Sequence, residues 1–291
     1  MNILSIQSWV SFGHVGNAAA MFPLQRLGAE VWAVHTVQFS NHTGYGAWTG
    51  DVFSGDAVRA LVRGMTARSA LTGLDAVLSG YLGDADIGRA ILEAVAVARL
   101  TNPGLLYCCD PVMGDSGRGL FVRPEIPDLL ATEMLPASDI LTPNQFELQR
   151  LTGLACDNPA ELLQAVRNIQ SRMRPDGPRI VLVTSVENSG TPEGMVELMV
   201  AARHEAFSLR MPALGFSPNG AGDLIAALFL FQILNHASLR ESLENAASAT
   251  WGVLAHTLRH GSRELCLVAA QQEIVAPARR FKAEEIPFQA V

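Results

Sequence analysis

Short apolar runs alternate with longer helical patterns through the first two thirds of the chain, and this alternation restricts the fold more than any other feature. We expect strands at residues 3–7, 30–36, 76–79, 105–110, 140–142 and 180–184. We expect helices between them, at residues 18–27, 57–69, 85–100, 145–152 and 160–173. Such alternation is typical of a parallel sheet covered by helices on both faces. The sequence therefore predicts an α/β fold.

The pattern changes after residue 184. Residues 195–201 and 204–210 flank a short polar link and predict an antiparallel hairpin. Long helices are expected at residues 222–235 and 239–260, with a last helix near 264–274. A chain of 291 residues, 49% of them hydrophobic, can bury a sizeable core. We expect residues 1–291 to form a single domain.

Charge and lysine content exclude several classes of protein. The net charge is −7 and no basic stripe with interleaved aromatic residues occurs, so we expect no nucleic-acid partner and favour small molecules. The only lysine is Lys282, in the charged C-terminal tail. A P-loop and the protein-kinase pattern both need a lysine elsewhere. Phosphoryl chemistry in this chain must therefore rest on metal ions, helix termini and arginines.

The cysteines and the N-terminal residues bear on the cellular location. Cys108, Cys109, Cys156 and Cys266 show no C-x-x-C spacing, and we expect them to be buried and reduced. The adjacent pair should point to opposite faces of a strand. The N-terminus lacks a basic flank and a cleavage site, and no apolar run reaches about 18 residues. We expect a cytoplasmic protein with no membrane partner.

The segment Gly220-Ala221-Gly222-Asp223, followed by an apolar run over residues 224–230, carries the strongest chemical signal. The glycines allow a tight turn, and the first N–H groups of the helix that follows lack intrahelical partners and attract anions. Asp223 adds a possible base, a pairing that suits phosphoryl transfer to a hydroxyl. The alternative is an acidic residue that only stabilises the helix dipole, after ordinary loop glycines. Ile225 excludes a dinucleotide-binding G-x-G-x-x-G pattern.

Polar residues follow the expected strands. They are Gln7-Ser8, residues 36–43, Gly80-Tyr81, Asp110-Pro111, Pro143-Asn144 and Thr184-Ser185. Ligands of open α/β sheets bind outside the carboxyl ends of the strands. Each of these segments is also an ordinary way to end a strand.

Asp110, Asn144 and Glu147 are candidates for a magnesium site. Mg²⁺ prefers oxygen ligands and keeps several waters, so one or two carboxylates acting partly through water are enough. Asn144 and Glu147, three residues apart at an expected helix start, fit a capping box equally well. Both interpretations stay open at this stage.

Three further features could belong to a site. Residues 115–119 are glycine-rich and could form a lid in which Arg118 reaches a phosphate, or a solvated loop. His14 and His42 lie in the expected rim loops and could line the site or be ordinary surface histidines. His256 and His260 have i, i+4 spacing without the glutamate of a zinc protease, so we expect no metal there.

With these residues assembled, the chain resembles the pyridoxal kinases of the ribokinase-like superfamily over nearly its full length. Residues 6–17 (IQSWVSFGHVGN) and 37–45 (VQFSNHTGY) are specific to the bacterial pyridoxal kinase branch, whereas Asn144-x-x-Glu147 and Gly-Ala-Gly-Asp are shared more widely. The resemblance implies a ribokinase-like three-layer sandwich, with a mostly parallel central sheet between helices. It implies ATP-dependent phosphorylation of the 5′-hydroxymethyl group of pyridoxal in vitamin B6 salvage, with pyridoxine and pyridoxamine as further candidates.

Residue roles follow from the same resemblance. The pyridine pocket would consist of Ser8, Val15, Phe39, Thr43, Gly44 and Tyr81. The nucleotide and its Mg²⁺ would meet Asp110, Thr142, Asn144, Glu147, Thr184, Met211, Pro212, Ala213 and Leu214, with Asp110 and Glu147 holding the metal partly through water. Asp223 would be the base, and the N–H groups of Gly220, Ala221 and Gly222 would hold the developing charge. The resemblance also implies a homodimer and leaves a monovalent cation open.

The chain departs from the family pattern at three positions. Trp9 replaces a histidine of many relatives, Thr184 a lysine of some, and Phe121 a tyrosine of some. These changes would reshape the pocket edge, remove a phosphate contact and delete a hydroxyl. Two other functions remain as alternatives: a hydroxymethylpyrimidine kinase, and a non-catalytic protein that binds vitamin B6 or a nucleotide.

Overall fold

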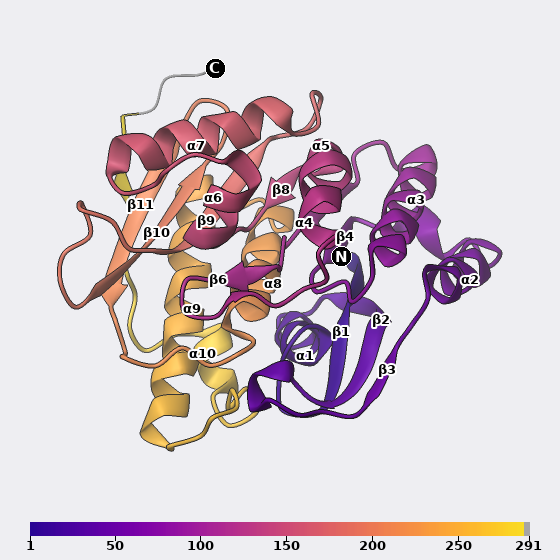
Figure 1. The fold of residues 1–291 in the computed structure, drawn as a ribbon, viewed down its shortest axis with the longest axis horizontal. Coiled ribbons are helices and arrows are strands. Elements are labelled where there is room, and N and C mark those ends of the chain that lie inside the picture. Colours follow the sequence, from indigo (N-terminus) through magenta and orange to yellow (C-terminus); the bar gives the residue numbers. More distant parts are fainter. Residues whose placement is uncertain (288–291) are drawn as a thin grey trace.

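A ten-stranded sheet forms the centre of the molecule in a computed structural model that describes residues 1–287 (Figure 1). The strands lie in the order β12-β11-β10-β9-β8-β5-β4-β1-β2-β3. Their bounds are β1 (Asn2–Phe12), β2 (Glu30–Asn41), β3 (Gly50–Val52), β4 (Ala76–Ser79), β5 (Leu106–Cys109), β8 (Ile140–Leu141), β9 (Ile180–Val186), β10 (Met195–Ala201), β11 (Ala206–Pro212) and β12 (Glu284–Glu285). In this spatial order, the six neighbouring strands β9, β8, β5, β4, β1 and β2 pair in parallel. Antiparallel strands extend both edges, with β10, β11 and β12 beyond β9 and β3 beyond β2.

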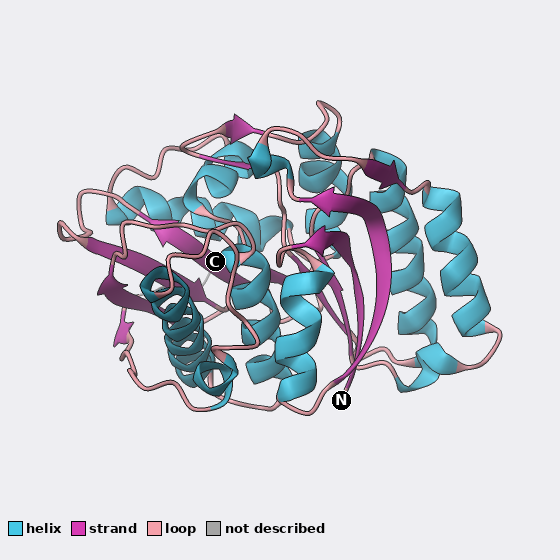
Figure 2. Cartoon of the chain, turned by 90° about the horizontal axis from the view of Figure 1, so that it is seen from below, coloured by secondary structure: helices cyan, strands magenta, loops and turns pink. Residues whose placement is uncertain are grey.

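Helices cover both faces of this sheet, as Figure 2 shows from below. One face carries α2 (Gly55–Thr66), η2 (Ala70–Gly73), α3 (Ala85–Thr101), α4 (Ile126–Leu129), η3 (Leu130–Met134), α5 (Leu135–Ala137), α6 (Gln145–Thr152) and α7 (Pro159–Arg172). The other face carries α1 (Asn17–Arg26), α8 (Ala221–Leu234), α9 (Leu239–Arg259) and α10 (Gln271–Val275). The predicted α/β fold with helices on both faces is confirmed.

Each face of the sheet has its own hydrophobic core, because successive side chains of a strand point to opposite sides. Cys108 belongs to the core that includes residues of α1 and α8, whereas Cys109 belongs to the core that includes residues of α3 and α7, as the sequence predicts for adjacent strand residues. All four thiols are free, but Cys266 is only partly buried, contrary to the expectation. No helix among residues 1–287 is long and apolar enough to cross a membrane.

The predicted strands and helices are found with small shifts in their ends, except in three regions. β1 and β2 continue to Phe12 and Asn41, well beyond the predicted residues 7 and 36, and so place Ser8 and Phe39 within strands. Residues 115–119, predicted as a lid or a solvated loop, belong to a small hairpin of β6 (Gly114–Asp115) and β7 (Gly119–Leu120).

The last predicted helix, near residues 264–274, is wrong over most of its length, since only α10 at Gln271–Val275 is helical. The Ser262 hydroxyl explains the difference, because it accepts a hydrogen bond from Glu264 N and donates one to Glu264 O. A serine that bonds its neighbouring backbone in this way competes with helix formation. Glu264 therefore lies in a bend after α9.

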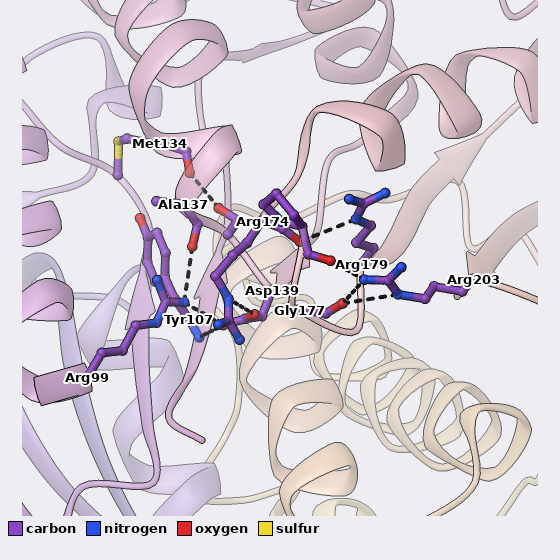
Figure 3. Close-up of polar contacts among 11 residues, drawn as sticks. Arg99, Tyr107, Met134, Ala137, Asp139, Arg174, Gly177, Arg179 and Arg203 are labelled. Carbon is purple, nitrogen blue, oxygen red and sulfur yellow. Dashed lines mark hydrogen bonds and ion pairs between the residues drawn. The ribbon is translucent and has the colours of Figure 1, made fainter. Parts of the chain in front are cut away.

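A buried ionic cluster holds the amino ends of β5 and β8 together (Figure 3). Asp139, which is fully buried before β8, accepts hydrogen bonds from Arg99 Nη2 at 2.6 Å and Arg174 Nε at 2.7 Å. Tyr107 N of β5 donates to the same carboxylate at 2.8 Å. A buried carboxylate is tolerated when it is paired in this way.

Candidate active site

A cavity of about 600 Å³ opens at the carboxyl ends of the parallel strands. Of the residues proposed from sequence, those that line it are Ser8, Val15, Phe39, His42, Thr43, Tyr81, Asp110, Arg118, Thr142, Asn144, Glu147, Thr184, Met211, Pro212, Ala213, Leu214, Gly220, Ala221, Gly222 and Asp223. His14, which could also have lined the site, does not. Gly44 lies beside the cavity, where an added Cβ would come 2.8 Å from Asn219 Nδ2 and 3.0 Å from His42 Nδ1. The structure thus brings together segments that are up to about two hundred residues apart in sequence.

One end of the cavity is apolar with a few polar side chains. Val10, Val37 and Phe39 form a small cluster against which Val15 and Tyr81 pack. Ser8 lies where the register of β1 against β2 shifts, between Gln7 and Trp9. A flat heteroaromatic ring with polar edges needs such a mixture of walls and hydrogen-bonding groups.

Gly16 makes this end possible. Its φ is 54°, and a Cβ there would overlap the backbone and hydroxyl oxygens of Ser8. Only glycine tolerates both the conformation and the approach. Val10 and Val37 were not singled out from sequence, because their alternating apolar pattern is that of any core strand.

Three acids line the cavity. Asp110 follows β5, Glu147 lies in the first turn of α6 and Asp223 in the first turn of α8. Burial raises the pKa of Asp110 well above its usual range, and the nearby carboxylates of Glu147 and Asp223 raise it further. Burial also raises the pKa values of Glu147 and Asp223. Hydrogen bonds from backbone N–H groups partly offset this rise: those of Asn144, Met113 and Gly114 lower the pKa of Glu147, and that of Gly16 lowers the pKa of Asp223.

Asn144 and Glu147 form the capping box that the sequence left open. Asn144 Oδ1 accepts from Glu147 N at 2.8 Å, and Glu147 Oε2 accepts from Asn144 N at 2.9 Å. Glu147 Oε1 also accepts from Met113 N at 2.9 Å, and Asn144 Nδ2 donates to Gly114 O at 2.8 Å. Both side chains line the cavity as well. Both residues therefore cap α6, and these hydrogen bonds hold them at the cavity wall.

The start of α8 presents free backbone donors to the cavity. Gly220 precedes the helix with a φ of 91°, and no side chain caps the first N–H groups. A Cβ on Gly220 would overlap the carbonyl oxygen of His14, whereas one on Gly222 would meet no protein atom within 4 Å. Gly220 is thus required by packing, and Gly222 leaves open space in front of a positive helix end.

The far end of the cavity is built from strand ends and from α9. Thr184 of β9 and residues 211–214, at and just after the end of β11, lie there with Thr250, Trp251 and Leu254 of α9. Trp251 Nε1 donates to Pro212 O at 3.0 Å and so holds this segment against the helix. Sequence reasoning missed the three α9 residues, because their spacing is that of an ordinary buried helix face.

The β6–β7 hairpin lies over the cavity and carries Arg118. Its guanidinium contacts the Asp115 carboxylate at 2.6 Å, donates to Asn219 Oδ1 at 2.9 Å and lies 4.9 Å from the centre of the Phe121 ring. Among the cavity-lining residues that the structure describes, Arg118 is the only arginine or lysine. It bridges the hairpin to the loop before α8.

The comparisons with known proteins agree with this geometry. The phosphomethylpyrimidine kinase family model matches residues 53–267. The chain is 55% identical over 284 residues to the pyridoxal kinase PdxY of Granulibacter bethesdensis, covering 98% of this chain and 99% of the relative. It is 51% identical over 287 residues to that of Deinococcus radiodurans, covering 98% and 96%.

Solved structures are similar over the same length. The pyridoxal kinase of Leishmania donovani in complex with ADP and ginkgotoxin has a TM-score of 0.91 at 28% identity, covering 98% of this chain and 99% of that one. The complex of the same enzyme with ADP and pyridoxamine has a TM-score of 0.90 at 27% identity, with the same coverage.

The chain belongs to the pyridoxal kinase family. Its ten-stranded sheet between helix layers is the ribokinase-like fold of that family. Within the family, the three departures can now be located. Trp9 packs on His35 with ring centres 4.9 Å apart and does not line the cavity, so the expected change to the pocket edge is not seen. Thr184 and Phe121 do line it.

Proposed function

We propose that this member of the pyridoxal kinase family transfers the γ-phosphoryl group of ATP to the 5′-hydroxymethyl oxygen of pyridoxal. One observation carries the proposal: a single cavity joins the aromatic end around Phe39 and Tyr81 to the far end at residues 211–214, with Asp223 and the start of α8 between them. That arrangement offers one end for the acceptor ring, the other end for the nucleotide, and a base between them. Phosphoryl transfer requires such positioning, with the attacking and leaving oxygens roughly in line.

The substrate end would hold the pyridine ring between Phe39 and Tyr81, with Ser8 and Thr43 bonding its nitrogen and substituents. The 5′-hydroxymethyl group would then face Asp223. Burial raises the pKa of Asp223, which makes it a better base than an exposed aspartate. The alcohol is about as weak an acid as water, so the proton moves to Asp223 late, once the new phosphate bond forms.

The start of α8 would stabilise the charge that develops on the transferred group. Residues 220–222 line the cavity, and α8 has no side-chain cap among the described residues. Fixed donors of this kind need no reorganisation as charge builds up. Arg118 adds a guanidinium from the hairpin above.

The acid pair Asp110 and Glu147 fits a divalent cation. Burial raises the pKa values of both carboxylates, so their charged forms are favoured only when a cation lies nearby. Residues 1–287 contain no group of three or more His, Cys, Asp or Glu that could hold a metal, which accords with Mg²⁺ held by one or two carboxylates and water. The ion, when bound, neutralises the phosphate charge of ATP.

Hydroxymethylpyrimidine phosphorylation is the second candidate, because the matching family model carries the name of a phosphomethylpyrimidine kinase. The residues around Ser8 and Thr43, which are specific to the pyridoxal kinases in sequence, favour pyridoxal. A non-catalytic binding role has less support, since a carrier has no need of the three acids.

The test is a coupled assay that measures ADP release, with and without Mg²⁺. The acceptors compared are pyridoxal, pyridoxine, pyridoxamine and hydroxymethylpyrimidine. We expect the highest kcat/KM for a vitamin B6 compound and loss of turnover without the metal. Preference for hydroxymethylpyrimidine would support the second candidate. Binding of pyridoxal without ADP release under any condition would support the carrier. The homodimer, the cytoplasmic location and a monovalent cation stay predictions.

A further inference from the structure

Glu264, in the bend after α9, contacts two loops of the substrate end. Its Oε1 lies 2.9 Å from His42 Nε2 and accepts a hydrogen bond from Tyr45 OH at 2.7 Å. Its Oε2 accepts from His14 N at 3.2 Å. The side chains of Glu264 and His42 are only 12% and 8% exposed. One carboxylate thus collects three donors from segments far apart in the sequence.

Those donors flank the residues that we place against the pyridine ring. His42 and Tyr45 enclose Thr43 in the short helix η1 (Thr43–Tyr45), and His14 precedes Val15. Both Thr43 and Val15 line the cavity, whereas Glu264 does not. Glu264 therefore acts on the substrate end only through its neighbours.

The same residue is linked to the phosphate end. The carbonyl oxygen of His14 lies against Gly220, and a Cβ on Gly220 would also come 3.1 Å from Leu265 Cδ1. The His14 carbonyl group and the side chain of Leu265, the residue after Glu264, thus pack on the glycine that precedes α8. A shift of Glu264 would move the substrate loops relative to the helix that carries Asp223.

The surroundings of Glu264 fit a fixed anchor. Ser262 holds its backbone through two hydrogen bonds, and the Arg263 guanidinium lies 4.5 Å from the centre of the Tyr45 ring. Gly13, with a φ of 95°, leaves room for the carboxylate, because a Cβ there would overlap Glu264 Oε2. The bond to Glu264 also raises the pKa of the Tyr45 phenol, so the phenol stays a donor.

We propose that Glu264 is a positioning residue for pyridoxal: it fixes the loops 13–15 and 42–45 to each other and to the start of α8. The proposal rests on the proposed function. Carboxylates accept several charge-assisted hydrogen bonds at once, which suits them to join loops. A misplacement of about 1 Å far from the reacting atoms can cost roughly 100-fold in rate.

The test compares Glu264→Ala and Glu264→Gln with the wild-type protein in the ADP-release assay. For Glu264→Ala we expect the KM for pyridoxal to rise about tenfold or more while the KM for ATP stays within about twofold, since the loss of a hydrogen bond to a charged group weakens an interaction by about that factor. Glu264→Gln keeps an acceptor for His42 and Tyr45 and should recover part of the loss.

Glu244→Ala is the matched control. Glu244 is also a buried glutamate that joins α9 to a distant segment, since it accepts from Lys282 Nζ at 2.7 Å and from Ala283 N at 3.1 Å, but it does not line the cavity. We expect it to lower the melting temperature without changing either KM. An equal rise of the pyridoxal KM in both variants would reduce Glu264 to a structural role.

A double-mutant cycle with Tyr45→Phe tests the path. If Glu264 acts through η1, Tyr45→Phe raises the pyridoxal KM in the wild-type background and adds nothing in Glu264→Ala. Additive effects, or an unchanged pyridoxal KM in Glu264→Ala, would overturn the proposal. Wild-type protein that releases no ADP with pyridoxal would instead contradict the proposed function, and direct titration of pyridoxal into the same variants would then still test Glu264.

Discussion

Asp139 and Asp110 are both buried aspartates next to neighbouring parallel strands, yet their surroundings are opposite. Asp139 precedes β8 at the amino ends of the sheet, and its carboxylate is held by Arg99, Arg174 and a backbone N–H (Figure 3). Asp110 follows β5 at the carboxyl ends, where its neighbours are the acids Glu147 and Asp223. One carboxylate is neutralised by the protein, and the other is not.

The difference indicates that the two ends of the sheet serve different needs. At the amino ends, arginines offset the cost of burying a charge, and the cluster fixes the strands. At the carboxyl ends, the chain places like charges together, an arrangement that costs stability unless a cation or a proton joins them. Local conflicts of this kind are typical of functional sites. The comparison leads to four predictions, from the largest effect to the smallest.

Asp223→Asn tests whether the acid cluster contains the base. We expect kcat to fall by about 100-fold to 10,000-fold, the usual contribution of a general base, while pyridoxal and ATP still bind. Steady-state kinetics together with a binding titration measure both. Turnover within a few-fold of the wild type would remove Asp223 from the mechanism and leave the acids without a catalytic member.

Asp139→Asn tests the neutralised end. Because Arg99 and Arg174 are only 18% and 22% exposed, the substitution leaves two largely buried guanidinium groups without their anion. We expect the free energy of unfolding to fall by about 3 kcal/mol, as when one partner of a buried pair is removed. Chemical denaturation measures this value. Asp56→Asn, at a side chain that is 90% exposed, is the control and should change it by less than about 0.5 kcal/mol.

Asp110→Asn tests the carboxyl ends of the strands, where we expect the substitution to raise the free energy of unfolding and not to lower it. Removing one of three neighbouring buried acids should raise the free energy of unfolding of the metal-free protein at pH 8, because burial and the two nearby carboxylates disfavour the charged form of Asp110. The same denaturation experiment applies. A loss as large as that of Asp139→Asn would mean that Asp110 has a stabilising partner and that the contrast between the two ends is wrong.

The pH dependence of stability gives the smallest effect. Burial raises the folded-state pKa values of Asp110, Glu147 and Asp223, so their protonated forms favour the folded state. That contribution is complete below the unfolded pKa values, near about 4, and is lost as pH rises through the folded values, about 8 for Glu147. We expect the metal-free melting temperature to fall between pH 6 and pH 8, and Mg²⁺ to restore it. An equal slope in Asp110→Asn would assign the change to other groups.

The sequence was sufficient for the architecture because the apolar periods are local. The strands at residues 76–79 and 195–201 and the helix at 145–152 were predicted with their observed bounds. It was insufficient where a single side chain redirects the backbone, as Ser262 does before the predicted last helix. Short edge elements such as β3 and β12 also escaped, since two or three residues carry no period.

For the site, the strand ends and the Gly-Ala-Gly-Asp segment identified the rim. The residues of α9 and Glu264 could not be predicted in this way, because their part in the site depends on packing between distant segments. The arginine pairing of Asp139 was missed for the same reason. The sequence therefore identified Asp110 as a site residue. It did not reveal that Asp110 lies near other acids whereas Asp139 is paired with arginines.

The most direct test of this account is the rate of pyridoxal-dependent ADP release per folded molecule in Asp110→Asn and Asp139→Asn, each assayed well below its melting temperature. We predict that Asp110→Asn loses most of its Mg²⁺-dependent turnover although it is the more stable variant, and that Asp139→Asn retains near wild-type turnover although it is the less stable one. Full turnover in Asp110→Asn, or a comparable loss in both variants, would contradict the account.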